Sequence, residues 1–246
     1  MIEGIDGASV AGIPNCTEVA AKGYRFGIPR LAFGHVRDHA AKEYLWRLRA
    51  AGMIARSGYG YNRSWEDGRS QADFQTAVAR ELGASFLWVD IEPAKGQRSD
   101  DGTWPVATDA PHLARPVTIA RLERQRDLGL PFGVYGGPWY LGLLDLPAWV
   151  GERPLWLSHY GVTVPTVPRP WKGYAIWQRE ANVTLAGAKV DINETPLTEE
   201  QLVSLFEGAP LPYDILAPVL RAVDAAAGTD GSAERFVTRD EGPQIE

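Results

Sequence analysis

The most informative stretch of this chain is Phe86-Leu87-Trp88-Val89-Asp90-Ile91-Glu92-Pro93. Its apolar run predicts a short buried strand, and Pro93 ends the strand because proline has no N–H for the ladder. Side chains two residues apart on a strand share a face, so Asp90 and Glu92 are expected to point the same way. Close carboxylates push the pKa of one acid above the other, which suits general acid catalysis. Alternatively, the two acids lie at a solvated strand end and have no catalytic role.

Short apolar runs alternate with helical patterns along the chain, which predicts parallel strands joined by crossover helices. We expect strands at 2–6, 24–33, 53–61, 86–92, 130–135, 155–160, 173–178 and 188–193. We expect helices at 17–22, 38–51, 68–83, 115–128 and 198–207. The fold class is therefore α/β, an irregular TIM-like β/α barrel of eight strands. Few helices are expected between the last strands, because their connections are short and broken.

The length and composition fit one sizeable core. The chain has 246 residues, of which 45% are hydrophobic and 10% aromatic, enough for a single barrel domain at 1–207. Residues 208–246 are predicted to be a C-terminal helix or linker followed by a flexible polar tail. A net charge of -6 argues against nucleic acid as a partner.

Metal sites, disulfides and membrane segments are not expected. Cys16 is the only cysteine, which excludes an intramolecular disulfide and a multi-cysteine metal site. His35 and His39 have ligand-like spacing but no supporting carboxylate motif, so we interpret them as incidental. We expect no metal and no organic cofactor. The first residues predict a strand rather than a signal peptide, and no apolar run is long enough to span a membrane.

Polar and aromatic residues gather where the predicted strands end. Active sites of β/α barrels lie at the carboxyl ends of the strands. Four carboxylates, Asp6, Asp90, Glu92 and Asp191, would converge there within a rim of aromatic side chains. Such an arrangement suits a sugar, because aromatic faces stack on the ring while acids act on the glycosidic bond. The candidate sugar-binding residues are Arg30, Tyr61, Tyr135, Trp156, Tyr160, Trp177 and Gln178.

Four sequence segments that contain several of these residues together resemble motifs of the family 25 glycoside hydrolases. These are the Chalaropsis-type lysozymes, or N-acetylmuramidases, common among phage endolysins. The segments are Gly4-Ile5-Asp6-Gly7-Ala8-Ser9, Val89-Asp90-Ile91-Glu92, Tyr174-Ala175-Ile176-Trp177-Gln178 and Val190-Asp191-Ile192-Asn193. Their order and spacing match the family over residues 1–207. Three details depart from it: one extra residue precedes Ser9, the region from Arg30 to His39 is unusual, and the third strand ends in Tyr-Gly-Tyr-Asn. These departures concern substrate subsites more than the acids.

The resemblance implies cleavage of the β-1,4 bond between N-acetylmuramic acid and N-acetylglucosamine in peptidoglycan. Position by position, it implies that Glu92 is the general acid and that Asp90 stabilises charge on the sugar or its 2-acetamido group. Asp6 and Asp191 would complete the acidic site and orient the other two. The resemblance implies hydrolysis with retention of configuration. Two nucleophiles remain possible: the acetamido carbonyl oxygen of the substrate, or a carboxylate of the protein.

Other interpretations remain at this point. Tyr135, Trp156 and Trp177 are equally suited to the barrel core, and Arg30 can pair with one of the acids. The same site could belong to a non-catalytic glycan-binding barrel, to a hydrolase of another polysaccharide, or to a phage tail component. In the last case residues 211–246 would contact other virion proteins. We expect synthesis in the cytoplasm of a host and action on its cell wall, after holin release or from the virion.

Overall fold

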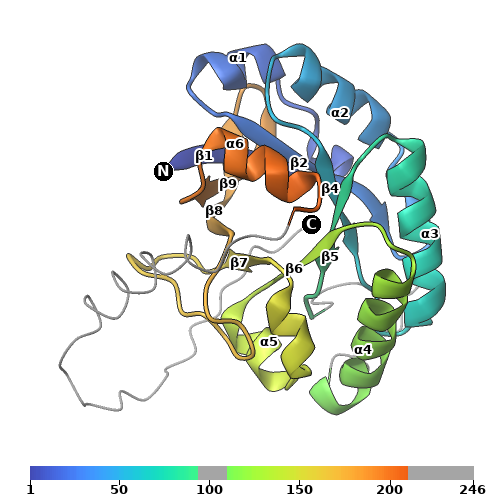
Figure 1. The fold of residues 1–246 in the computed structure, drawn as a ribbon. Coiled ribbons are helices and arrows are strands. Elements are labelled where there is room, and N and C mark those ends of the chain that lie inside the picture. The colour runs from blue at the N-terminus through green and yellow to red at the C-terminus, as the bar shows by residue number, and fades with distance from the viewer. Residues whose placement is uncertain (94–109, 210–246) are drawn as a thin grey trace, which may run out of the picture.

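The structure is a computed structural model that describes residues 1–93 and 110–209. Its strands form one sheet in the order β1-β9-β8-β7-β6-β5-β4-β2-β3, and an additional pairing of β1 with β2 closes it into a barrel (Figure 1). The strands are β1 (Ile2–Gly7), β2 (Phe26–Phe33), β3 (Val36–Arg37), β4 (Ser57–Tyr61), β5 (Phe86–Asp90), β6 (Phe132–Gly136), β7 (Leu155–Ser158), β8 (Ile176–Leu185) and β9 (Ala188–Thr195). The predicted irregular β/α barrel is confirmed.

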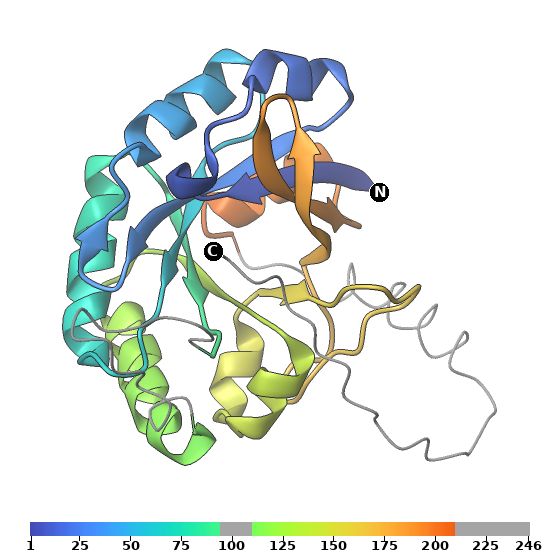
Figure 2. The ribbon, with the colours of Figure 1, turned by 180° about the vertical axis from the view of Figure 1, so that it is seen from behind.

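The helices cover only part of the barrel. They are α1 (Cys16–Ala21), α2 (Ala41–Ala50), α3 (Gly68–Glu81), α4 (Pro111–Asp127), α5 (Pro138–Leu143) and α6 (Glu199–Phe206), with 3-10 turns η1 (Ser9–Ala11) and η3 (Ala148–Glu152). Helices α1 to α4 form an arc outside the first strands, whereas β8 and β9 carry no outer helix (Figures 1 and 2). Few helices accompany the last strands, as expected. The sequence pattern missed α5, and α4 begins one turn earlier than expected.

The alternation of side chains along the strands divides the core into an interior and an outer layer. On β5, Trp88 belongs to the interior cluster, together with Phe26 and Trp156, whereas Val89 packs in the outer layer. Leu205 and Phe206 of α6 join the interior cluster, and the Phe206 ring lies 5.9 Å from Phe86 at the start of β5. Helix α6 therefore closes the end of the barrel where the parallel strands begin.

The direction of the last strand differs from the prediction. β9 pairs antiparallel with both β8 and β1, whereas parallel strands were expected throughout. β8 continues to Leu185 and a two-residue turn, Ala186-Gly187, leads into β9 at Ala188. Both turn residues have positive φ, 48° and 89°, as a tight hairpin of this twist requires. The short connection without a helix that was predicted between Gln178 and Ala188 is therefore a hairpin, which Figure 2 shows in orange.

A buried polar network holds α3 and α4 against the end of β4. Gln75 Nε2 donates to the carbonyl oxygens of Gly34 (3.0 Å) and Tyr61 (2.9 Å). Arg121 donates from Nη2 to Gln75 Oε1 (2.9 Å) and from Nη1 to Gln125 Oε1 (2.6 Å). Burial lowers the pKa of Arg121 to about 9. This network fixes the carboxyl end of β4, next to β5, from inside the helical layer.

Two expectations concern the remaining chain. No helix in 1–93 or 110–209 is long and apolar enough to cross a membrane. The last helix was expected at 198–207, and α6 indeed begins after Thr198, which forms a capping box with Gln201. The predicted C-terminal helix, linker and tail lie outside the described residues.

Candidate active site

The four predicted acids lie at one end of the barrel, where the parallel strands finish. Asp6 near the end of β1 is directly opposite Asp191 on β9. Because β9 runs antiparallel, the early part of this strand reaches the same end as the late part of β1. Asp90 is the last residue of β5, between Tyr61 of β4 and Tyr135 of β6. We call Asp6, Asp90, Glu92 and Asp191 the acid cluster.

Gln178 connects two members of the acid cluster with two tyrosines. Its Nε2 donates to Asp6 Oδ1 (2.7 Å) and to Asp191 Oδ2 (3.2 Å). Its Oε1 accepts from the Tyr135 hydroxyl (2.7 Å) and from the Tyr160 hydroxyl. Both amide hydrogens and both oxygen lone pairs are used, so one orientation of this buried side chain is selected. Gln178 is thus a positioning residue, since its polar atoms are all engaged by protein groups.

Asn193 extends the same network from Asp6 to Trp156. Its Nδ2 donates to Asp6 Oδ1 (2.8 Å), and its Oδ1 accepts from Trp156 Nε1 (2.7 Å). Asn193 lies two residues after Asp191 on β9 and therefore shares its face. The sequence pattern showed Asn193 at a strand end, but it was not among the candidate site residues. The same period-two argument that paired Asp90 with Glu92 could have included it.

Burial and mutual repulsion raise the pKa values of the acid cluster. The pKa of Asp6 is well above its usual range, because it is buried and faces Asp191, although Asn193 and Gln178 oppose the shift. The pKa of Asp90 is also well above its usual range, first through burial and then through Glu92 and Asp6, while Arg30 opposes it. Burial likewise raises the pKa of Asp191. The cluster therefore retains protons where isolated carboxyls have lost them.

Glu92 combines a raised pKa with access to the barrel end. Burial raises its pKa to about 7, a hydrogen bond with Tyr135 lowers it, and Asp191 raises it. Glu92 is only partly buried, whereas Asp6 and Asp90 are both 4% exposed. Among these three acids, Glu92 is the one most open to a substrate and holds its proton near neutral pH. Those are the two properties that a general acid needs.

Arg30 lies beside the cluster and contacts a different acid. Its Nε donates to Asp38 Oδ2 (3.1 Å), and Asp38 also accepts from the backbone amides of Ser9 and Ala40. The pKa of Asp38 is lowered because these hydrogen bonds and Arg30 outweigh the effect of burial. Asp38 was not singled out from the sequence. The pair anchors Arg30, whose charge opposes the pKa shift of Asp90.

The aromatic candidates divide into rim and core residues. Tyr160 is 46% exposed at the rim, and Tyr61 is partly buried with its ring stacked on Phe33 at 4.6 Å. Trp156, 1% exposed, lies in the barrel interior and has its ring 4.5 Å from Tyr135. As a surface that contacts sugar, the prediction for Trp156 is wrong, because the barrel layers cover it.

Trp177 also differs from the prediction. It packs in the outer layer and donates from Nε1 to the carbonyl oxygen of His159 (2.8 Å). Gln178, the next residue, points into the barrel, because neighbours on a strand face opposite sides. Trp177 and Gln178 therefore cannot line the same site. The exposed aromatic residue that the pattern missed is Trp139, 64% exposed at the start of α5, directly after β6.

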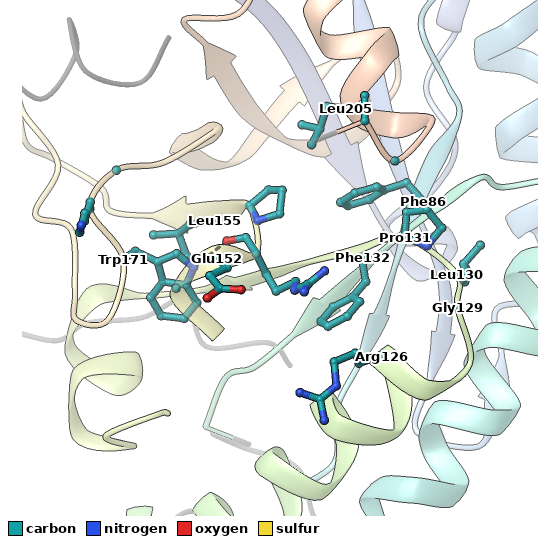
Figure 3. A pocket seen from close by; sticks show the side chains of 17 residues that line it. Phe86, Arg126, Gly129, Leu130, Pro131, Phe132, Glu152, Leu155, Trp171 and Leu205 are labelled. Carbon is teal, nitrogen blue, oxygen red and sulfur yellow. Dashed lines mark hydrogen bonds between the residues drawn. The ribbon is translucent and has the colours of Figure 1, made fainter. Parts of the chain in front are cut away.

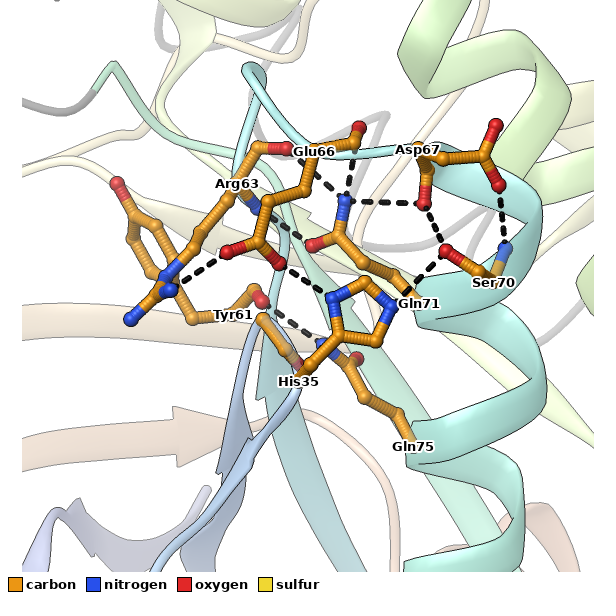
Figure 4. Close-up of polar contacts among 9 residues, drawn as sticks. His35, Tyr61, Arg63, Glu66, Asp67, Ser70, Gln71 and Gln75 are labelled. Atoms are coloured by element: carbon orange, nitrogen blue, oxygen red, sulfur yellow. Dashed lines mark hydrogen bonds and ion pairs between the residues drawn. The ribbon is translucent and has the colours of Figure 1, made fainter.

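His35 belongs to a polar cluster beside α3, shown in Figure 4. Its Nδ1 lies 2.6 Å from Glu66 Oε2, and its Nε2 lies 2.9 Å from Ser70 Oγ. This order of contacts resembles a hydrolase triad, but the Ser70 hydroxyl donates to the Asp67 carbonyl oxygen (3.0 Å). The Asp67 carboxylate in turn caps the Ser70 amide (2.7 Å). The cluster caps α3 and ties the β2–β3 turn to it.

His39 lies apart from that cluster, with Nδ1 3.3 Å from Ser9 Oγ. The two histidines thus have different partners. No group of three or more His, Cys, Asp or Glu side chains in the described part of the chain is arranged to hold a metal ion.

Comparison with solved structures identifies the architecture. The bacterial lysozyme of Streptomyces coelicolor is 21% identical over 85% of this chain and 98% of its own, with a TM-score of 0.69. A family GH25 lysozyme from Aspergillus fumigatus is 18% identical over 84% and 99%, with a TM-score of 0.68. The catalytic domain of endolysin ply40 from bacteriophage P40 of Listeria monocytogenes is 19% identical over 84% and 98%, with a TM-score of 0.61. No family model and no curated protein matches the sequence. The chain therefore has the fold of the family 25 glycoside hydrolases.

Proposed function

We propose that this chain is a peptidoglycan hydrolase, an N-acetylmuramidase that cleaves the β-1,4 bond after N-acetylmuramic acid. The observation that carries the proposal is the acid cluster at the carboxyl end of the barrel, with the pKa of Glu92 raised to about 7. Glycoside hydrolysis needs one protonated and one ionised carboxyl at the same bond. The likeness of the fold to lysozymes supports the choice of substrate.

Glu92 is proposed to protonate the leaving glycosidic oxygen. Asp90, two residues earlier and largely buried, would stabilise the positive charge that develops on the sugar or orient its 2-acetamido group. Asp6 and Asp191 act through Gln178, which contacts both carboxylates. Retention of configuration is part of the proposal. Attack by the acetamido carbonyl and attack by a carboxylate both use this set of residues.

The glycan is proposed to lie across the rim beside Glu92. Tyr160 and Tyr61 present ring surface there, and the exposed Trp139 offers a larger one at the start of α5. Flat aromatic surfaces of this kind stack on sugar rings. Arg30 is held by Asp38, and its charge supplies the positive potential beside the acids.

The test measures release of new reducing ends from purified peptidoglycan by wild type and by Glu92→Gln. Loss of a general acid lowers rates by about 10²–10⁴-fold, and we expect a loss of that size. The matched control is Glu43→Gln, which removes an exposed acid paired with Arg47 and should leave activity unchanged. If well-folded wild type binds peptidoglycan but releases no ends, the barrel is a glycan-binding module instead.

We extend the proposal to lysis or penetration of a bacterial host by a bacteriophage. Its support is the fold shared with a phage endolysin. Lysis of intact cells from outside, compared with lysis after expression together with a membrane pore, distinguishes a virion-borne enzyme from a released one. A role of residues 211–246 in binding virion proteins remains a prediction.

A further inference from the structure

A cavity lies at the end of the barrel opposite the acid cluster. It has a volume of about 540 Å³ and is formed where β5, β6 and β7 begin, beside the end of α6. Figure 3 shows Phe86, Phe132 and Leu205 facing it, with Trp171 on the far wall. Ligand-sized cavities span about 300–1,000 Å³, so the space can hold several side chains. Because Phe86 starts β5 and Asp90 ends it, the length of that strand separates the two sites.

The cavity has apolar walls and an excess of positive charge. Arg126, Arg153 and Lys172 line it, and Glu152 is the one acid among the lining residues. Arg126 stacks on Trp149 at 4.7 Å and Arg153 on Phe132 at 5.4 Å. None of the three cations forms an ion pair within residues 1–93 and 110–209. Arg153 Nε is buried and has no hydrogen-bond partner among those residues. The expected occupant is therefore apolar and carries an acid.

The described chain ends at the cavity itself. Gly208 and Ala209 line it, and Gly208, at φ 84°, packs so closely on Pro131 that a Cβ would lie 2.4 Å from its ring. The chain continues as Pro210-Leu211-Pro212-Tyr213-Asp214-Ile215-Leu216. Four extended residues reach about 13 Å, which brings Tyr213 and its neighbours within range of the cavity. The two prolines restrict the free chain and so lower the entropy lost on docking.

We propose that residues 211–216 dock into this cavity of their own chain. Their apolar side chains would cover Phe86, Phe132, Trp171 and Leu205, and Asp214 would pair with one of the three cations. The docked segment would then stabilise the packing of α6 against the amino-terminal end of the barrel. It lies apart from the acid cluster, so the proposal does not depend on the proposed function.

Amide hydrogen exchange on the full chain, followed by mass spectrometry, tests whether residues 211–216 dock in the cavity. Ile215→Asp places an unpaired charge in the docked segment and should release it. Peptides covering 150–155 and 204–209 should then exchange about tenfold faster or more. Val237→Asp is the matched control, because it makes a similar change in a more distant part of the C-terminal segment, next to Phe236. Unchanged exchange in Ile215→Asp, or faster exchange in Val237→Asp instead, would overturn the proposal.

Charge reversal provides a second readout. Asp214→Lys should speed exchange of the same peptides, and a compensating Lys172→Glu or Arg153→Glu should restore protection in at least one double variant. Failure of every double variant would contradict the pairing of Asp214 with these cations. The experiment is repeated over a hundredfold range of protein concentration. Protection that rises with concentration would place the segment of a second copy in the cavity and refute docking within one chain.

Discussion

Glu92 carries an electrostatic cost to folding that a neutral substitution removes. Its pKa rises from 4.5 to about 7 in the folded protein. Well below pH 4.5 the residue is protonated in both states and the cost is absent. As pH rises toward 7, the unfolded chain ionises while the folded protein keeps the proton, so stability falls. The linkage relation puts the loss at about 1 kcal/mol at pH 5 and about 3 kcal/mol at pH 7.

Glu92→Gln should therefore be more stable than wild type, and its advantage should grow with pH. We expect the difference in unfolding free energy between the two proteins to increase by about 2 kcal/mol from pH 5 to pH 7. Urea unfolding followed by far-UV circular dichroism at both pH values measures it. Taking the difference between the two proteins cancels the pH dependence of groups remote from Glu92. Glu92 also raises the pKa values of Asp90 and Asp6, so its replacement relieves these acids and adds to the gain in the same direction.

The control is Glu43→Gln, whose exposed pair with Arg47 is worth about 0.3–0.5 kcal/mol at either pH. If Glu92→Gln gains the same stability at pH 5 and pH 7, Glu92 does not hold a proton near neutrality. The assignment of Glu92 as the general acid would then lose its physical basis. The measurement needs no substrate, so it is independent of the identity of the glycan.

Four further predictions concern the site and its support. The ratio kcat/KM on peptidoglycan should fall as pH rises above about 7, where Glu92 ionises; a flat alkaline limb would contradict this. Gln178→Met should cost about 2–3 kcal/mol, because it leaves buried partners unsatisfied, and should lower activity at least tenfold; urea unfolding and the reducing-end assay would show it. Tyr160→Phe removes one of those contacts at the exposed rim and should cost about 1 kcal/mol or less, so an equal loss in both variants would refute the network. Gly68→Ala should lower thermal stability, since its Cβ would lie 2.2 Å from the Val117 carbonyl oxygen; an unchanged melting temperature would count against the α3–α4 packing.

Much of the barrel could be predicted from the sequence, because its strands are buried on both sides. The run 86–89 is apolar, and all five residues of β5, Asp90 included, are buried. The direction of β9 could not be predicted in the same way. Direction depends on the turn at Ala186-Gly187, which has little local signature beyond a single glycine. A hairpin and a short loop between parallel strands look alike at that length.

The acids were easier to predict than their surroundings. Asp6, Asp90 and Asp191 stand at strand ends, where an acid has no packing role, and each lies in the cluster. Trp156 and Trp177 failed as sugar-binding candidates because burial depends on which face of a strand a residue takes. One register position separates the barrel interior from the outer layer. The partner of Arg30 could not be predicted from the sequence. Asp38 lies beside Arg30 because of the β2–β3 turn, and the spacing of the two residues does not indicate it.

Digestion of peptidoglycan in ¹⁸O-labelled water, with mass spectrometry of the released muropeptides, shows which glycosidic bond is cleaved and whether Glu92 is needed. We predict one ¹⁸O atom at the new reducing end of N-acetylmuramic acid. We also predict that Glu92→Gln folds and yields at least about a hundredfold less labelled product. Label at N-acetylglucosamine, or equal product from wild type and Glu92→Gln, would contradict these predictions.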